Sequence, residues 1–233
     1  MPSLAVFTRD LRTHDNPILA AAGEGVVPVF VSDPGLAERH GSPNRQAFLA
    51  EALADLDESL RGFGSRLVHR HGPWLETVTS LATEIEAESI HVARDVSAYA
   101  QSRLDGLHRE TRVPVIEHDI LTVVAPDALE TGTGTPYKVF TPYHRRWLDA
   151  PRRAIANPPG RMAAHAIPSH PLPEPDRVGT SRYREHGGDT AALANLDSWL
   201  DSIDSSDDAR DRLAAPTSRV SAALHFGTLS PLM

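Results

Sequence analysis

The chain has 233 residues, of which 40% are hydrophobic and 23% charged, and its formal net charge is −8. This length suits one large domain or one domain with a further segment, and the apolar content is sufficient for a globular core. The acidic balance argues against a chain that serves mainly as a nucleic-acid surface, because such surfaces normally carry a basic patch.

The sequence contains no cysteine, so it offers neither a disulfide framework nor a thiolate metal site. The N-terminus lacks the basic segment and apolar run of a secretory signal. No apolar run approaches the roughly 18–20 residues that span a bilayer. These features predict a cytoplasmic protein with no membrane partner. The histidines follow no metal-binding pattern, so we expect them to be surface residues.

Short apolar segments alternate with helical patterns through the first half of the chain. The segments are too short for helices and rich in β-formers, which predicts buried strands at 3–8 and 26–31 and further strands at 66–69, 89–93 and 113–116. Helices are predicted between them at 17–22, 42–61, 74–86 and 98–110. This order predicts an α/β fold: a five-stranded parallel Rossmann-like sheet with helices on both faces.

The alternation ends after Glu117. A short helix is predicted at 142–148, and residues 150–190 are rich in Pro, Gly, Arg and His, which is typical of a linker. A further helix is predicted at 191–200. The chain therefore changes character after its sheet-forming half.

Residues 7–17 follow the first predicted strand and read Phe-Thr-Arg-Asp-Leu-Arg-Thr-His-Asp-Asn-Pro. By composition this is a polar loop in which Asn16 caps the next helix and Pro17 begins it. Its order resembles the Phe-Arg-Arg-Asp-Leu-Arg-x-x-Asp-Asn-Pro signature of DNA photolyases and cryptochromes, with Thr8 in place of Arg or His. We expect the charged side chains to anchor the loop by ion pairs: Arg9, Asp10 and Arg12.

Residues 134–143, with Trp147, resemble the Gly-x-Pro-Tyr-x-Val-Phe-Thr-Pro-Phe-x-x-x-Trp segment of the same family. The bare pattern is an aromatic, Pro-flanked loop, and we expect a mainly structural role in joining the sheet domain to the C-terminal part of the chain. Between Lys138 and Arg161 there are six basic residues and one acid. This run could face DNA phosphates, but a solvated face is the favoured interpretation.

Residues 217–231 carry the third resemblance. Hydroxyls where a helix is predicted to begin suit a phosphate, and the order resembles the Thr-Ser-x-Leu-Ser clasp that opens the flavin-binding half of photolyases. The resemblance implies contacts to the FAD diphosphate from Thr217, Ser218, Val220 and Ser221. The family's upstream Tyr-x-x-x-Arg-Asp is present with Ser206 in place of Tyr, and its Arg210 is the candidate for DNA binding.

Parallel sheets bind ligands outside the carboxyl ends of their strands. Photolyases hold a light-harvesting antenna pigment, a folate or a deazaflavin or flavin, in their sheet domain. Residues 95–99 resemble the Asp-x-x-Pro-Tyr of deazaflavin types, whereas Tyr99 and Ala100 stand where folate types carry Asn-Glu. The antenna candidates, for which ordinary polar loop residues are the alternative, are Val31, Ser32, Asp33, Arg45, Asp95, Val96 and Tyr99.

Three ordered resemblances across the chain imply a deoxyribodipyrimidine photolyase, which uses FAD and light to repair pyrimidine dimers flipped out of DNA. The alternatives are a cryptochrome-like light-signalling flavoprotein and a non-enzymatic pigment- or nucleotide-binding module. The predicted division is an antenna domain at 1–125, an interdomain loop and linker at 126–190, and a truncated start of the all-α FAD-binding domain at 191–233.

Because the catalytic pockets of the family lie in the helical domain, we name no catalytic residue. We expect this N-terminal portion to be inactive alone and to bind FAD weakly. An apolar surface should be exposed where the helical domain would dock, through which the portion could self-associate. The full-length form is expected to be a monomer that acts on damaged DNA.

Overall fold

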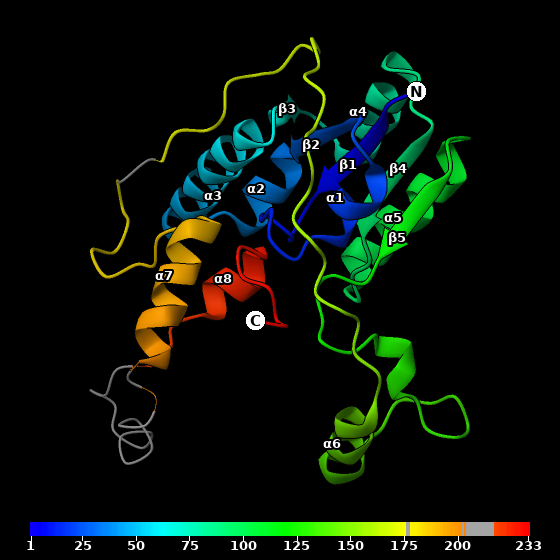
Figure 1. Cartoon of the computed structure of the whole chain (residues 1–233), viewed down its shortest axis with the longest axis vertical. Helices are drawn as coiled ribbons and strands as arrows, with labels where there is room; N and C mark the ends of the chain where they lie inside the picture. Colours follow the sequence, from blue (N-terminus) through cyan, green and yellow to red (C-terminus); the bar gives the residue numbers. More distant parts are fainter. Residues whose placement is uncertain (176–177, 202, 204–216) are drawn as a thin grey trace.

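A computed structural model describes residues 1–175, 178–201, 203 and 217–233. Five parallel strands form one sheet in the order β3-β2-β1-β4-β5 (Figure 1). Their bounds are β1 Ser3–Phe7, β2 Val26–Ser32, β3 Val68–His71, β4 Ser89–Ala93 and β5 Val115–His118. On the central strand, Leu4 lies opposite both Val27 and Ile90. The predicted α/β fold with a parallel sheet is confirmed.

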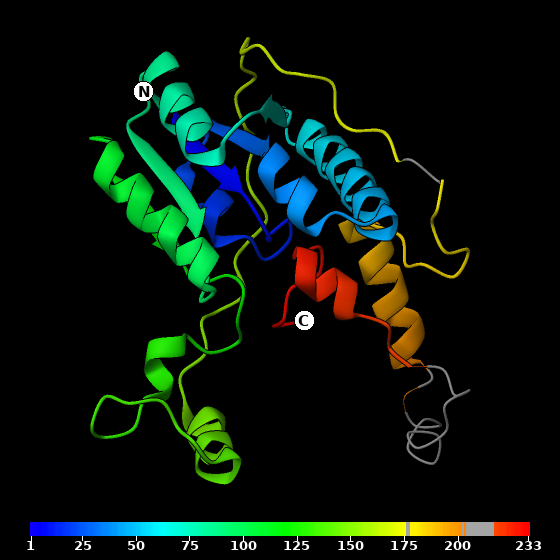
Figure 2. The same ribbon diagram turned by 180° about the vertical axis from the view of Figure 1, so that it is seen from behind.

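Helices cover both faces of the sheet, as Figures 1 and 2 show from opposite sides. Helices α1 (Pro17–Ala22) and α3 (Pro43–Gly62) cover one face, and α4 (Trp74–Glu84) and α5 (Ala98–Glu110) cover the other. Alternate residues of β1 therefore enter two cores: Ala5 and Phe7 pack toward α1 and α3, while Leu4 and Val6 pack toward α4 and α5.

Strands β3 and β5 begin two residues later than predicted. The backbone N–H of Leu67 donates to the side chain of Asp57 at 2.8 Å instead of joining the sheet. At the other edge, Pro114 has no N–H to donate to a ladder. The alternation of strand and helix fixes the topology, whereas these local contacts fix the strand ends.

Helix α2 (Pro34–His40) is absent from the sequence prediction. Its N-cap is Asp33, whose carboxylate accepts from the N–H of Gly35 at 2.9 Å, and proline occupies the first helical position. An Asp-Pro start after a strand is a recognisable helix signal. The helix buries none of its own residues, so its apolar pattern was too weak to reveal it.

The second half adds η1 (Pro126–Leu129), α6 (Phe140–Asp149), α7 (Asp189–Leu200) and α8 (Ser221–Phe226). Helix α6 stands away from the sheet at the bottom of Figure 1, buries none of its residues and leaves Phe140 72% exposed. No helix of the described ranges is long and apolar enough to span a membrane.

The predicted linker is bound to the sheet domain by backbone hydrogen bonds. Met162 N–H donates to Phe63 O at 2.7 Å, and Ala163 N–H donates to Glu24 O at 2.8 Å. Further along, His170 N–H donates to the carbonyl of His69 in β3 at 2.9 Å. The segment is therefore irregular in secondary structure but fixed in position.

Helix α8 docks against the loop after β1. Leu11 N–H donates to Phe226 O at 3.3 Å, and the Phe226 ring stacks on Phe48 of α3 with centroids 4.8 Å apart. The helix ends at Gly227, where φ is +69° and an added Cβ would lie 1.8 Å from the carbonyl oxygen of Arg9. Only glycine permits this approach, so the segment after α8 is held firmly on the sheet domain.

Candidate functional site

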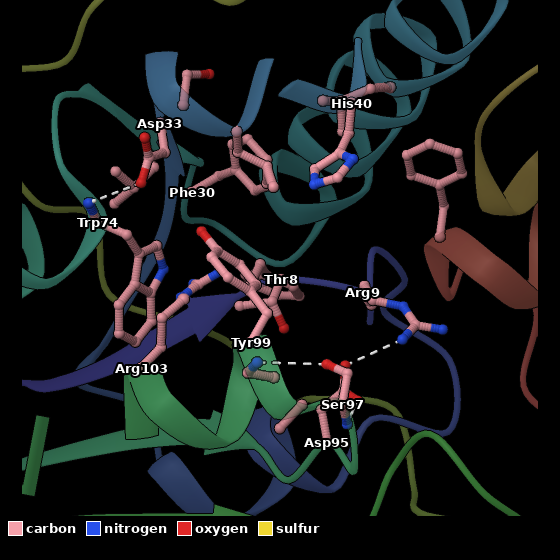
Figure 3. Close-up of a pocket in the computed structure, with 18 of the residues that line it drawn as sticks. Thr8, Arg9, Phe30, Asp33, His40, Trp74, Asp95, Ser97, Tyr99 and Arg103 are labelled. Atoms are coloured by element: carbon pink, nitrogen blue, oxygen red, sulfur yellow. Dashed lines mark hydrogen bonds and ion pairs between the residues drawn. The ribbon is translucent and has the colours of Figure 1, made fainter. Parts of the chain in front are cut away.

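A cavity of about 390 Å³ lies at the carboxyl ends of β1, β2 and β4 (Figure 3). The direction of strand order reverses between β1 and β4, and open α/β sheets bind ligands at such switch points. The residues at the end of each strand, or just beyond it, line the cavity: Thr8 and Arg9 after β1, Ser32 and Asp33 at the end of β2, and Asp95 after β4.

The structure brings together every predicted antenna residue except one. Those that line the cavity are Val31, Ser32, Asp33, Arg45, Asp95 and Tyr99. Val96 does not line it and is 66% exposed. The backbone turns at this point because Ser97 caps α5, its hydroxyl accepting from Ala100 N–H at 3.3 Å. Val96 therefore lies outside the cavity lining, whereas the other candidates meet there, and contacts of any of them with a pigment stay a prediction.

Asp95 organises one wall of the cavity. Its carboxylate accepts from the N–H of Ser97 at 2.9 Å and forms an ion pair with Arg9 at 3.0 Å. Burial alone would raise the pKa of Asp95, but the Ser97 N–H and the Arg9 charge more than offset it, so the pKa lies below its usual value. Arg9 also donates to the carbonyl of His225 in α8 at 3.0 Å. The pair therefore connects the sheet domain with the terminal helix.

Asp33 holds two helices at the opposite wall. One carboxylate oxygen caps α2, and the other accepts from the N–H of Trp74 at the start of α4, at 3.3 Å. Both oxygens of Asp33 are thus engaged with backbone, so this residue shapes the cavity rather than offering a free acid.

Several lining residues were missed from the sequence. Leu36, Ala37 and His40 belong to α2, which was not predicted, and His225 and Phe226 reach the cavity only because α8 docks there. Trp74 and Arg103 were also missed. The sequence offered one signal for Trp74. It directly follows Gly72-Pro73, shortly after the strand predicted at 66–69, and therefore lies at the sheet edge where ligands bind.

Trp74 and Arg103 form a stacked pair in the cavity wall. Trp74 is only 4% exposed, and the guanidinium carbon of Arg103 lies 3.8 Å from its ring centroid and 5.4 Å from that of Tyr99. Figure 3 shows the guanidinium between the two rings. Burial lowers the pKa of Arg103, and the neighbouring Tyr99 opposes this. Within the described part of the chain, no carboxylate forms an ion pair with Arg103.

Basic groups lie on the side nearer α8. Arg45 donates to the carbonyl of His40 at 3.4 Å, and Arg9 and His225 lie beside them in the cavity lining. Burial lowers the pKa of His225, and the charges of Arg9 and Arg45 add to the effect. Because Arg9 is paired with Asp95 and the lowered pKa favours neutral His225, Arg45 supplies the main positive charge on this side.

The predicted FAD contacts Thr217, Ser218, Val220 and Ser221 lie on the short segment that enters α8. The Ser218 carbonyl accepts from the side chain of Asn195 in α7 at 2.9 Å. A second cavity of about 200 Å³ lies nearby, but it is lined by other residues, among them Arg219 and Ala223. Ser206 and Arg210 lie outside the described residues.

The first signature loop is anchored as expected at Arg9, whose ion pair with Asp95 confirms the prediction. Arg12 acts differently: it is 1% exposed and donates to the carbonyls of Gly227, Asp15 and Ile120. Asp10 is also buried, and burial raises its pKa to about 6. Arg12 therefore ties three segments together through backbone oxygens rather than through an ion pair.

The second signature segment makes mostly internal contacts. The ring of His144 stacks on those of Phe140 and Trp147, with centroids 5.4 and 6.3 Å away, and Arg152 lies 4.8 Å from the Trp147 ring. Its role in joining domains stays a prediction.

The five-stranded parallel sheet flanked by helices defines an α/β protein of the Rossmann-like type. A family model described as DNA photolyase matches residues 3–172, which is more than half of the chain. The chain belongs to the DNA photolyase family.

Relatives extend the match over almost the whole chain. A deoxyribodipyrimidine photo-lyase of Streptomyces griseus is 38% identical over 242 residues, which cover 98% of this chain and 53% of the relative. One of Halobacterium salinarum is 32% identical, covering 95% and 51%. The crystal structure of a bacterial class III photolyase from Agrobacterium tumefaciens matches with a TM-score of 0.82 and 26% identity, covering 99% and 51%. The chain spans about half the length of the curated relatives it matches.

Proposed function

We propose that this chain is the light-harvesting half of a deoxyribodipyrimidine photolyase, which repairs pyrimidine dimers in DNA with light and FAD. The observation that carries the proposal is the cavity at the carboxyl ends of β1, β2 and β4, because polar residues from three strands meet there as a ligand site of this fold requires. Family membership and the relatives named photo-lyase supply the reaction class.

The cavity suits a planar pigment. Its volume of about 390 Å³ falls in the range of small-molecule sites, roughly 300–1,000 Å³. Aromatic rings form much of the wall, from Phe30, Trp74 and Tyr99, and a buried donor on Trp74 has no partner among the described residues. A deazaflavin or flavin is favoured over a folate, because Tyr99 and Ala100 replace the Asn-Glu pair that the resemblance leads us to expect in folate types.

We propose that the segment entering α8 contributes one edge of the FAD site. Bound FAD supplies light-driven electron transfer to the damaged bases. The side chains of Thr217 and Ser221 are exposed and free to reach a diphosphate, while Arg12 and Phe48 hold the segment in place. Damaged DNA as the partner, Arg210 as a DNA contact, a monomeric full-length form and a cytoplasmic location remain predictions.

A chimeric protein tests this function directly. The present chain is fused to the C-terminal half of the Streptomyces griseus relative, and repair of thymine dimers is measured across excitation wavelengths with a deazaflavin or flavin pigment added. Repair at the flavin band, with additional repair at the pigment band, supports the proposal. A chimera that binds FAD but leaves dimers intact under light contradicts it and points to light signalling.

A matched pair of variants links the pigment band to the cavity. Ala100→Trp fills the cavity, because Ala100 lines it, whereas Ala98→Trp places the same side chain on an exposed position of the same helix. We expect the first variant to lose only the repair driven at the pigment band, and the second to retain both bands. If both variants kept the repair driven at the pigment band, or both lost it, the antenna would not lie in this cavity.

A further inference from the structure

His69 lies inside the fold and not on the surface, where the sequence led us to expect the histidines. It belongs to β3 and is fully buried. Its ring Nδ1 lies 2.7 Å from the carbonyl oxygen of Pro171, and its Nε2 lies 2.8 Å from the Oγ of Ser32. A carbonyl oxygen can only accept, so Nδ1 carries the hydrogen and Nε2 accepts from the Ser32 hydroxyl. The two contacts therefore fit the neutral ring.

The segment at 162–171, called the strap below, covers the edge of the sheet beside this ring. β3 is an edge strand. The N–H of His69 donates to the Oγ of Ser169 at 2.9 Å, and its carbonyl accepts from the N–H of His170 at 2.9 Å. Open strand edges offer unpaired backbone groups to other chains, and the strap occupies these groups on β3.

Two exposed histidines stand beside the buried ring. The ring centroid of His71 lies 4.5 Å from that of His69 and 5.0 Å from that of His170, and the centroids of His69 and His170 are 6.4 Å apart. Within the described ranges no three such side chains are arranged to hold a metal ion. The three rings are therefore titratable groups that face one another across the contact between β3 and the strap.

The charged groups around the three rings do not neutralise them. No carboxylate of the described residues forms an ion pair with any of the three, and Glu174, just after the strap, is exposed. The acids of the neighbouring elements have other partners, in the pairs Asp57–Arg61 and Glu84–Arg70 and in the contacts of Asp33 with the N–H groups of Gly35 and Trp74. Arg66 donates to the carbonyl of Ile167 in the strap and adds a positive charge. A proton on His69 would thus be a buried charge near other cations.

We propose that the strap is an acid-sensitive latch, in which protonation of His69 beside His71 and His170 releases the strap and uncovers the edge of β3. Burial lowers the pKa of His69; the hydrogen bond to Pro171 offsets this in part, and the two neighbouring histidines lower the pKa further. Because the closed state has the lower pKa, the latch is fully stabilised above about pH 6.5 and loses stability as the pH falls below that value.

Native-state amide exchange of the intact chain, run from about pH 5 to about pH 8 and corrected for the intrinsic exchange rates, tests the latch. The N–H of residue 170 reports on the strap, and the N–H groups of β1 report on global unfolding. Nitrogen NMR of the imidazole rings gives the tautomer and charge of His69.

Three variants accompany the wild-type chain. The double variant His71→Gln/His170→Gln removes both exposed rings and leaves the hydrogen bonds of the buried ring intact. His69→Gln removes the buried ring itself. The matched control is His144→Gln, which removes an exposed histidine of α6, away from the sheet.

We expect His69 to stay neutral as the Nδ1–H tautomer above about pH 6.5. Below that pH the protection of the residue 170 N–H should fall, by at most about tenfold per pH unit for each linked proton, and more steeply than the protection of β1. The double variant should move this fall to lower pH, because His69 then takes up its proton without two facing charges. His69→Gln should lower the protection and flatten its pH dependence, and His144→Gln should match the wild-type chain.

Four outcomes would each overturn the latch. Residue 170 could follow β1 at every pH, which would mean that the strap does not open separately. The double variant could keep the wild-type pH dependence, or His69→Gln could keep it, and either result would mean that other groups titrate. An Nε2–H tautomer of His69 would contradict the hydrogen bonds assigned to the ring. If His69→Gln does not fold, the double variant and the tautomer still decide between these outcomes.

Discussion

Asp15 connects three segments of the chain, and its partners predict a large, pH-dependent contribution to stability. Its carboxylate binds the guanidinium of Arg153 in the linker, with Nη2 at 2.7 Å from Oδ2, and accepts from the N–H of Ala156 at 2.8 Å. The hydroxyl of Ser230, beyond α8, donates to the same carboxylate. Asp15 belongs to the loop after β1 that also contributes to the cavity.

The size of this contribution can be worked out from the pKa. Burial would raise the pKa of Asp15, but the bonds from Arg153, Ser230 and Ala156 outweigh it and lower the pKa from 3.8 to about 2. A difference near two pKa units corresponds to about 2–3 kcal/mol. Because the folded-state pKa is the lower one, this stabilisation is present above about pH 4 and is lost as the pH falls toward 2.

The substitution Arg153→Met leaves the buried Asp15 carboxylate without its cation. We expect a loss of about 3 kcal/mol in the free energy of unfolding at pH 7, since removing one partner of a buried ion pair costs roughly 3–5 kcal/mol. Urea unfolding at pH 7 measures this loss. Asp15→Asn and the double variant complete a thermodynamic cycle that isolates the pair. A coupling free energy near zero, or one that stays unchanged down to pH 3, would show that the pair does not stabilise the fold in this way.

The other predictions concern a histidine pair, a glycine and the flavin site. Burial and the neighbouring His91 lower the pKa of His118 to about 4, so the free energy of unfolding should fall as the pH drops from about 6.5 through 4. His118→Gln should flatten that part of an acid-unfolding curve. An unchanged curve would contradict this role of His118. Gly227→Ala should destabilise the chain and speed amide exchange in α8, because the added Cβ would lie 1.8 Å from the Arg9 carbonyl oxygen. If the variant exchanged its α8 amides at the wild-type rates, the close contact would not matter for stability. The purified chain should carry little FAD in its visible spectrum, since the predicted FAD contacts line neither cavity; stoichiometric flavin would refute this.

The sheet was predictable because short segments rich in β-formers alternate with helical patterns along the chain. The cavity's polar rim was predictable for the same reason, since the strand order places Ser32 and Asp95 at one edge. The deeper walls of the cavity could not be predicted from the sequence. Trp74 and Arg103 meet through the packing of α4 and α5 on one another, and Phe226 enters through contacts with a loop near the N-terminus. Such meetings depend on tertiary packing, which local periodicity does not encode.

The segment at 217–231 also shows that sequence alone does not reveal tertiary contacts. The resemblance at 217–231 draws attention to four residues as ligand contacts, but the structure gives the nearby Phe226 and Gly227 the clearest role, as the residues that lock α8 onto the sheet domain. A sequence motif identifies residues by type and order. It does not say which of its members face a ligand and which face the protein.

The cavity at the carboxyl ends of β1, β2 and β4 is the site that we assign to the pigment. The most direct test is a fluorescence titration of the purified chain with 8-hydroxy-5-deazariboflavin, run in parallel with Ala100→Trp and Ala98→Trp. We predict saturable one-to-one binding by the wild-type chain and Ala98→Trp, and none by Ala100→Trp. Binding that survives in Ala100→Trp, or its absence from the wild-type chain, would contradict the assignment of the cavity.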